Sequence, residues 1–202
     1  SLITGMYPTT LGTHHMRAYK NSSEKRINSH NSLPYYSAKP KKPIRFFTED
    51  LRTNGYYCTN NSKEDYNMKT SPLAWDESSK TAHWRNRQKG QSFFSVFNFN
   101  ITHESCIWKN INSYTEYELE NVKTPNLFPN NDDIKKDILT NYKNIEKLDE
   151  QIGVIINQLK EDSLYDNTII FFFSDHGGPF PRYKRSIYET GIRVPMVVKW
   201  VD

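Results

Sequence analysis

The chain has 202 residues, of which 36% are hydrophobic and 25% are charged, and its formal net charge is +4. This length is enough for one domain with a sizeable core, and the nearly balanced charge does not indicate a nucleic-acid-binding protein. The sequence contains no run of about 18 apolar residues, so no membrane span is predicted. Two cysteines, Cys58 and Cys106, exclude a disulfide-rich scaffold and leave either one disulfide or two free thiols.

The first half of the chain alternates between polar loops and short apolar segments. Residues 1–5 predict the end of a helix that is capped near Gly5. The aromatic run SFFSVFNF at 92–99 predicts a buried strand. Between these two segments, the pattern predicts an irregular connection at 18–43, a short amphipathic helix at 44–54, a strand at 56–59 and a loop at 60–84.

A long amphipathic helix and two apolar strands dominate the second half. Apolar residues at intervals of three and four predict a helix over 132–160 with one buried stripe. Residues 106–131 carry only a weak pattern and predict a loop. The runs at 168–173 and 194–200 have no polar alternation, so we expect strands covered on both faces. Strand, helix and strand in this order predict an α/β fold with a mixed, mostly parallel sheet sandwiched by helices.

Polar residues that could bind a metal or transfer a proton follow two of the predicted strands. His103 lies just past the strand at 92–99, and Asp175 and His176 follow the strand at 168–173. In α/β sheets, sites form at the carboxyl ends of strands, so we expect these side chains to share a site. Asp and His are ligands of divalent cations. The alternative is structural, with Asp175 capping a helix and His176 hydrogen-bonded to the backbone.

The residues around this pair resemble a known family. The segment SDHGG at 174–178, followed by Lys184 and then YETGIRVP at 188–195, is similar to the second half of the sulfatase family, within the alkaline phosphatase superfamily. The stretch LITGMYP at 2–8 resembles the LLTGxYP that follows the sulfatase nucleophile motif. The strand FFSVFNFNITH at 93–103 and the segment GYYCTNNSKEDYN at 55–67 also resemble family segments. These matches span nearly the whole chain in the family's order.

The resemblance implies a role for several residues. Asp175 would bind a catalytic calcium ion, with His176 beside the metal and the sulfate. Lys63 and Lys184 would contact the sulfate and neutralise its charge. His103 would position the substrate or donate a proton to the leaving oxygen. Asp65 stands where many members have His, so its role departs from the family pattern.

The resemblance also implies that parts of the site lie outside these residues. The nucleophile motif, whose Cys or Ser is oxidised to formylglycine, would precede Ser1, which is not itself the nucleophile. The family's first metal carboxylates, an Asp-Asp pair on the first strand, are also missing. We therefore expect residues 1–202 to be a partial sulfatase catalytic domain that lacks its first strand and its C-terminal subdomain. Alone, it should be inactive and bind calcium poorly.

The substrate class follows from the same resemblance. Thr13-His14-His15-Met16-Arg17 and the loop carrying Asp65 look like a branch that includes heparan N-sulfatase-like and bacterial polysaccharide sulfatases. A sulfated carbohydrate is therefore the expected substrate, with His14, His15, Arg17 and Asp65 as candidate contacts. By family analogy, the protein is expected in the periplasm, in the lysosome or outside the cell. A phosphate or phosphonate ester hydrolase and a non-catalytic pseudoenzyme are the alternatives.

The charged residues also have purely structural interpretations. Lys63 suits the surface of a polar loop, and His103 suits a hydrogen-bonded strand end. Lys184 has Glu189 as an alternative partner. Arg193 and Glu189 favour an ion pair at the entry to the last strand over a contact with substrate.

Overall fold

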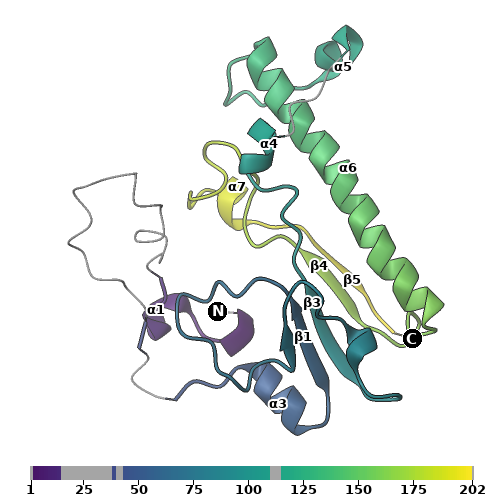
Figure 1. The fold of residues 1–202 in the computed structure, drawn as a ribbon. Helices are drawn as coiled ribbons and strands as arrows, with labels where there is room; N and C mark the ends of the chain where they lie inside the picture. The colour runs from purple at the N-terminus through teal and green to yellow at the C-terminus, as the bar shows by residue number, and fades with distance from the viewer. Residues whose placement is uncertain (1, 15–37, 40–42, 110–114, 202) are drawn as a thin grey trace. The chain divides into compact units, whose positions relative to one another are not determined.

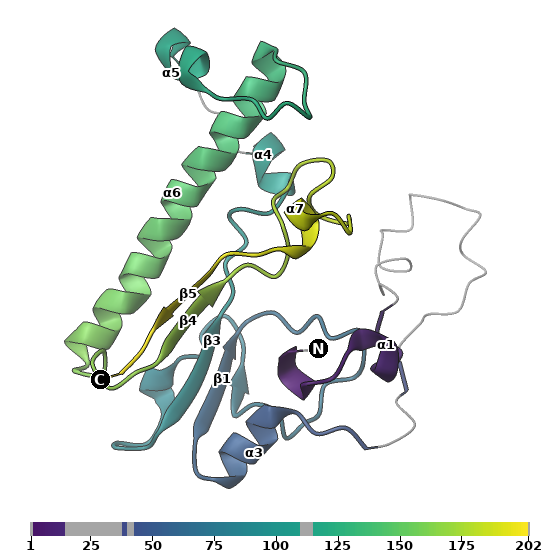
Figure 2. The ribbon, with the colours of Figure 1, turned by 180° about the vertical axis from the view of Figure 1, so that it is seen from behind.

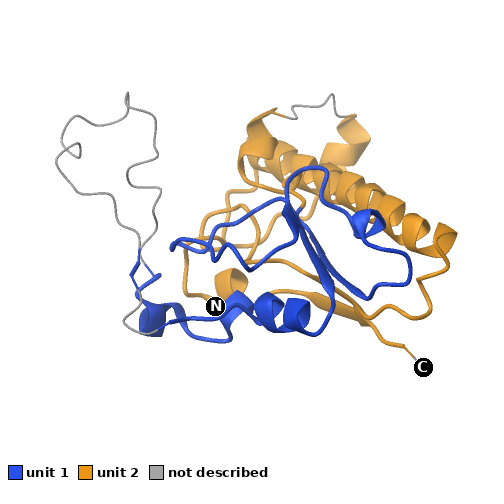
Figure 3. Cartoon of the chain, turned by 60° about the horizontal axis from the view of Figure 1, so that its bottom comes forward, with its two compact units in different colours: residues 1–98 blue, residues 99–202 orange. Residues whose placement is uncertain are grey.

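The computed structural model describes residues 2–14, 38–39, 43–109 and 115–201. These residues cluster into two units, residues 1–98 and residues 99–202 (Figure 3). A parallel sheet and flanking helices confirm the predicted α/β class. Both cysteines are free thiols, which decides between the two alternatives left by the sequence.

The first unit is built around a three-stranded parallel sheet in the order β2-β1-β3. Figure 1 labels the neighbouring strands β1 and β3. Tyr57 pairs with Phe93, and Thr59 pairs with Glu77. In chain order, its described elements are η1 (Leu2–Thr4), α1 (Pro8–Leu11), α3 (Phe47–Thr53), β1 (Tyr57–Asn61), β2 (Glu77–Ser78), η3 (Trp84–Asn86) and β3 (Phe93–Phe97).

Most of the expected elements of this unit are confirmed. The helix predicted over 44–54 is α3, which begins at Phe47 because the Glu49 carboxylate accepts a hydrogen bond from the Phe46 N–H at 3.3 Å. The strands predicted at 56–59 and 92–99 are β1 and β3. The segment 60–84 is not all loop, since it contains β2 and the first residue of η3. A two-residue strand has no periodicity for a pattern to reveal.

Aromatic side chains hold β3 in place. Trp84 is 1% exposed and stacks on Phe93 with ring centroids 5.8 Å apart, and its edge contacts Phe97 at 5.6 Å. On the other side of the strand, Phe94 meets Phe47 of α3 edge to face at 5.1 Å. These contacts explain why the aromatic run forms a strand and where it ends, just before the segment that carries His103.

The second unit contains a long helix and an antiparallel strand pair, β4 and β5 (Figure 2). In this pair, Phe171 lies opposite Val198. The polar segment between the two strands carries the short helix α7. The described elements are α4 (Ser105–Lys109), α5 (Glu116–Asn121), α6 (Asp132–Glu161), β4 (Ile170–Phe173), α7 (Glu189–Ile192) and β5 (Met196–Lys199).

The predicted long helix is confirmed as α6. The Asn131 side chain caps its first turn by accepting from the Ile134 N–H at 3.0 Å. The expected buried stripe is only partly present. Ile138 is buried, but Tyr142 is 49% exposed, although it belongs to the same apolar spacing. Spacing alone does not say how much of a helix its neighbours cover.

One expectation for the second unit is wrong, and another is not met by the described residues. The segment 106–131 is not a plain loop, because it carries most of α4 and all of α5. The strands β4 and β5 are not covered on both faces by the described residues, since Phe171 is 56% exposed and Val197 is 62% exposed. Within the part of the chain that the structure describes, none of the helices is long and apolar enough to cross a membrane.

Candidate active site

The turn after β4 presents Asp175 and His176 together. The Asp175 side chain is 68% exposed, and its Oδ1 lies 3.6 Å from Nε2 of His176. The other ring nitrogen of His176, Nδ1, lies 2.8 Å from the Gly177 carbonyl, and the Ser174 hydroxyl donates to the His176 carbonyl at 2.5 Å. Hydrogen bonds within the turn therefore fix its backbone, and the Asp175 carboxylate stays accessible to a ligand.

Close backbone packing holds this turn against the segment that follows it. The Gly177 N–H donates to the Gly191 carbonyl at 2.9 Å, and the Lys184 N–H donates to the Gly178 carbonyl at 3.0 Å. A Cβ on Gly177 would stand 1.8 Å from the Thr190 carbonyl oxygen. The absence of a side chain at Gly177 is therefore required for this approach, and Lys184 is tied by its own backbone to the turn that carries His176.

His103 lies between β3 and α4 and contacts Lys184. Its Nε2 is 3.0 Å from the Lys184 ammonium nitrogen, although the two residues are 81 positions apart in the chain. Its Nδ1 is 2.9 Å from the hydroxyl and 3.2 Å from the backbone nitrogen of Ser105. Two residues predicted from separate segments to share a site are thus brought together.

Sequence reasoning missed the carboxylate beside this pair. Glu104 Oε1 lies 3.7 Å from Lys184 Nζ and 2.6 Å from a guanidinium nitrogen of Arg185. The carboxylate thus lies between two consecutive cationic side chains. The only signal in the sequence was its position next to His103. In the structure, the carboxylate that pairs with Lys184 is that of Glu104, whereas the sequence had suggested Glu189.

The donor set at the turn is small for a metal site. A calcium ion takes six to eight oxygen ligands, and imidazole is not among its preferred donors. Among the described residues, no group of three or more His, Cys, Asp or Glu side chains could hold a metal ion. Asp175 and His176 alone do not make up a complete site. The expected calcium stays a prediction, and no chemical step is assigned to it.

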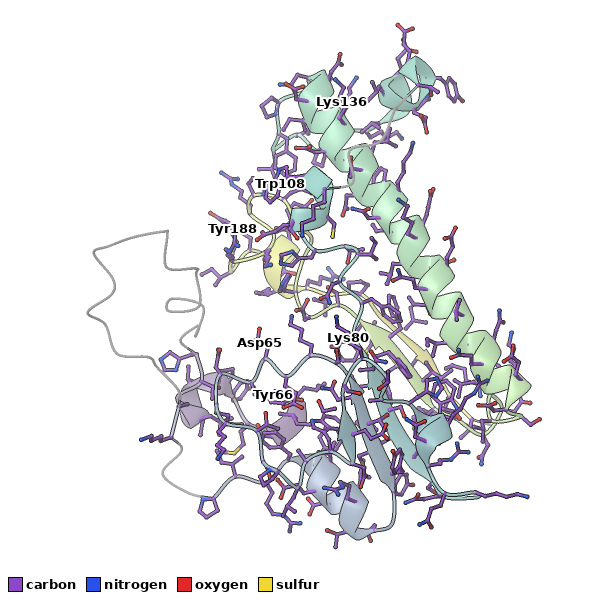
Figure 4. All side chains as sticks on the ribbon, in the orientation of Figure 1. Asp65, Tyr66, Lys80, Trp108, Lys136 and Tyr188 are labelled. Carbon is purple, nitrogen blue, oxygen red and sulfur yellow. The ribbon has the colours of Figure 1, made fainter. Side chains whose placement is uncertain are left out.

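The remaining candidate residues belong to the first unit or are not described. Lys63 and Asp65 are exposed on the loop after β1, where Figure 4 labels Asp65, and His14 is exposed just after α1. The Asn60 amide nitrogen donates to the Lys63 carbonyl at 3.2 Å, which anchors the backbone of that loop. His15 and Arg17 lie outside the described residues. The roles of all five stay predictions.

An exposed aromatic surface accompanies the cationic cluster. Trp108 on α4 is 66% exposed and Tyr188 before α7 is 57% exposed (Figure 4). The Arg182 guanidinium carbon lies 5.6 Å from the centre of the Tyr188 ring. The second unit therefore combines cationic groups, an accessible carboxylate–imidazole turn and exposed aromatic rings, which suits an α/β protein that binds an anionic group.

Comparison with known proteins assigns the family. The family model named Sulfatase matches residues 1–202, so the chain belongs to the sulfatase family. An ulvan-active sulfatase of Formosa agariphila is 40% identical over 99% of this chain and 38% of its own length. A second ulvan-active sulfatase of that organism is 24% identical over 99% of this chain and 45% of its own length.

A human relative matches a shorter segment. The N-sulphoglucosamine sulphohydrolase of Homo sapiens is 27% identical over 41% of this chain and 16% of its own length. The chain spans less than half the length of these curated relatives.

Proposed function

We propose that the complete protein containing this chain is a sulfatase that hydrolyses sulfate esters, or sulfamates, of a sulfated carbohydrate. The observation that carries the proposal is the contact between Lys184 and His103 at 3.0 Å. It places a cation beside a proton-transferring group, which is the pairing needed to bind a sulfate and assist its leaving oxygen. Family membership and the names of the relatives support this reaction class.

The residues of the cluster divide the chemistry between them. The Lys184 ammonium would hold a sulfate oxygen and neutralise charge on the transferring group, and Lys63 would do the same from the loop after β1. His103 Nε2 would hydrogen-bond the bridging oxygen of the ester and deliver the proton that the leaving alcohol needs. Asp175 and His176 would face the sulfate from the turn after β4.

Two groups outside the described residues complete the proposal. A formylglycine located before Ser1 would supply the nucleophilic oxygen, and a calcium ion would supply further positive charge at the sulfate. Asp175 would contribute a carboxylate ligand of that ion, with His176 beside the ion and the sulfate. The exposed Asp175 carboxylate is the feature that supports a ligand role.

A carbohydrate is the favoured substrate because of the exposed aromatic and cationic side chains. Trp108 and Tyr188 offer flat apolar faces, and Arg182 lies over the second of them. Sugar rings pack on such faces while their anionic substituents meet cations. His14, His15, Arg17 and Asp65 are further proposed contacts. A periplasmic, lysosomal or extracellular location would give the enzyme access to such polymers.

Turnover of aryl sulfate and aryl phosphate esters by the complete protein tests the proposal. We expect hydrolysis of the sulfate ester, and loss of about 100-fold or more in kcat/KM on Lys184→Ala. A preference for the phosphate ester would instead identify a phosphate or phosphonate ester hydrolase. Absence of turnover on either ester, in a protein that still binds sulfate, would identify a non-catalytic member.

A further inference from the structure

We propose that Glu104 is a positioning residue that holds the Lys184 ammonium against His103, with Arg185 as the second cation that fixes the carboxylate. This inference rests on the proposed function and adds a residue to its site. The carboxylate of Glu104 is the common partner: its Oε1 lies 3.7 Å from Lys184 Nζ and 2.6 Å from Arg185 Nη2.

The two ion pairs differ in how exposed their cations are to solvent. The side chains of Glu104 and Lys184 are each 17% exposed, whereas the side chain of Arg185 is 73% exposed. Water screens the Arg185 pair more strongly, so Glu104 acts mainly on Lys184. A lysine has a long flexible side chain, and a single contact with an imidazole does not fix its ammonium. The carboxylate supplies the second contact.

Ser105 orients the ring of His103. The Ser105 backbone N–H donates to Nδ1 at 3.2 Å, and the Ser105 hydroxyl lies 2.9 Å from the same nitrogen. Nδ1 is therefore a hydrogen-bond acceptor, and the ring is held with Nε2 directed at Lys184 Nζ, the group that is to bind the sulfate, at 3.0 Å.

The backbone at Arg185 is arranged for this double pairing. Its φ is +70°, in the left-handed region that non-glycine residues seldom adopt. Neighbouring side chains in an extended chain point to opposite sides, whereas here Lys184 and Arg185 reach the same carboxylate. A sparsely populated conformation that is kept beside reacting groups is typical of functional sites.

The charges predict opposite effects on binding and on turnover. Glu104 places a negative charge close to where an anionic sulfate must bind, so its presence weakens ground-state binding of the substrate. The same carboxylate keeps Lys184 aligned for the transition state. Removing the charge should therefore lower KM and kcat together. A loss of folded protein would lower kcat alone.

The test uses the complete protein and four variants. Steady-state kinetics on an aryl sulfate are measured for the wild type, Glu104→Gln, Glu104→Asp, Arg185→Ala and Glu150→Gln. Glu150 is an exposed residue of α6, so its variant carries the same charge change outside the cluster. Selective ¹⁵N labelling of histidine follows the Nε2 resonance of His103, and thermal unfolding checks that each variant is folded.

The expected results are specific. Glu104→Gln lowers kcat by about 10-fold or more and lowers KM, and Glu104→Asp restores most of the loss. Arg185→Ala has a smaller effect, and Glu150→Gln matches the wild type. The Nε2 resonance shifts in Glu104→Gln, because the Lys184 ammonium is no longer held beside this nitrogen. An unchanged kcat, or a fall in kcat with unchanged KM and a lowered unfolding temperature, would overturn the proposal.

The two proposals fail in different ways. If the wild type does not hydrolyse the ester, the proposed function fails and kinetics say nothing of Glu104. The ¹⁵N spectrum then decides the positioning role, because it needs no turnover. A Nε2 resonance that is unaffected by Glu104→Gln would refute that role, and a shift would support it.

Discussion

At the scale of single residues, one carboxylate joins three segments of the first unit. Asp76 accepts hydrogen bonds from Arg52 Nε at 3.0 Å and from the Cys58 N–H at 2.8 Å, and it pairs with Arg52 Nη2 at 2.8 Å. Both side chains are only about a quarter exposed, at 27% and 24%. The pair connects α3 to β1 and shields the backbone of Cys58. Burial, together with the nearby Asp76 charge, raises the pKa of the Cys58 thiol to about 12, so this thiol stays neutral.

We predict that Asp76→Asn lowers the free energy of unfolding by about 1–3 kcal/mol, because a charged acceptor with three donors is replaced by a neutral amide. Asp50→Asn is the matched control. Asp50 pairs with Arg45 at 2.6 Å, but their side chains are 59% and 63% exposed, so its loss should cost less than about 1 kcal/mol. Urea unfolding of both variants measures the difference, and equal costs would contradict the prediction.

At the scale of elements, a glycine contact determines how the turn after β4 meets α7. A Cβ at Gly177 would lie 1.8 Å from a backbone oxygen of Thr190, whereas a Cβ at Gly178 would lie 3.4 Å from the Tyr183 ring. We predict that Gly177→Ala destabilises the protein by about 1–3 kcal/mol or more and disturbs the turn, and that Gly178→Ala is tolerated. Thermal unfolding and aryl sulfate turnover of the two variants provide the comparison. Equal behaviour would show that the turn can move away from α7.

The short helix α5 depends on an ionised carboxylate. Glu118 accepts from the Thr115 N–H at 2.8 Å and pairs with Lys143 of α6 at 3.0 Å, and these contacts lower its pKa from 4.5 to about 2. Because the folded-state pKa is lowered, the contribution to stability is complete above about pH 4.5 and is lost as the pH falls towards 2. We predict that the contact between α5 and α6 weakens within this range.

Titration of the Glu118 side-chain carbon by NMR measures the effect. The midpoint should lie near 2 in the wild type and rise towards 4.5 in Lys143→Ala, since the backbone donor of Thr115 remains and only part of the lowering is lost. Lys147→Ala, on an exposed lysine one turn further along α6, should leave the midpoint unchanged. A wild-type midpoint at 4.5 would contradict the interpretation.

At the scale of the whole molecule, elements whose pattern extends over many residues were predictable, and short elements were not. The stripe of α6 and the aromatic run of β3 extend over enough residues to reveal their period, so both were predicted with nearly the right ends. The helices α4 and α5 have five and six residues, and α5 is held by a local cap, the Thr115–Glu118 pair. A weak pattern did not reveal them.

The candidate site divides in the same way. Motif resemblance pointed to His103 and Lys184, and the structure places them 3.0 Å apart. It could not reveal Glu104, because the carboxylate meets Lys184 and Arg185 only after a loop 80 and 81 positions away folds back. The spacing of residues in a sequence carries no information on such a contact.

The exposed face of β4 provides the last prediction. An apolar strand without polar alternation is typical of a covered sheet, yet Phe171 is 56% exposed in the described structure, while its neighbour Phe172 is half-buried. We expect the complete protein to cover this face. Phe171→Ala should then lower its free energy of unfolding by about 3–5 kcal/mol, as is typical of buried phenylalanine, and Phe172→Ala should cost a similar amount. Denaturant unfolding of both variants decides the matter, because a cost below about 0.5 kcal/mol for Phe171→Ala alone would mean that this face stays in contact with water.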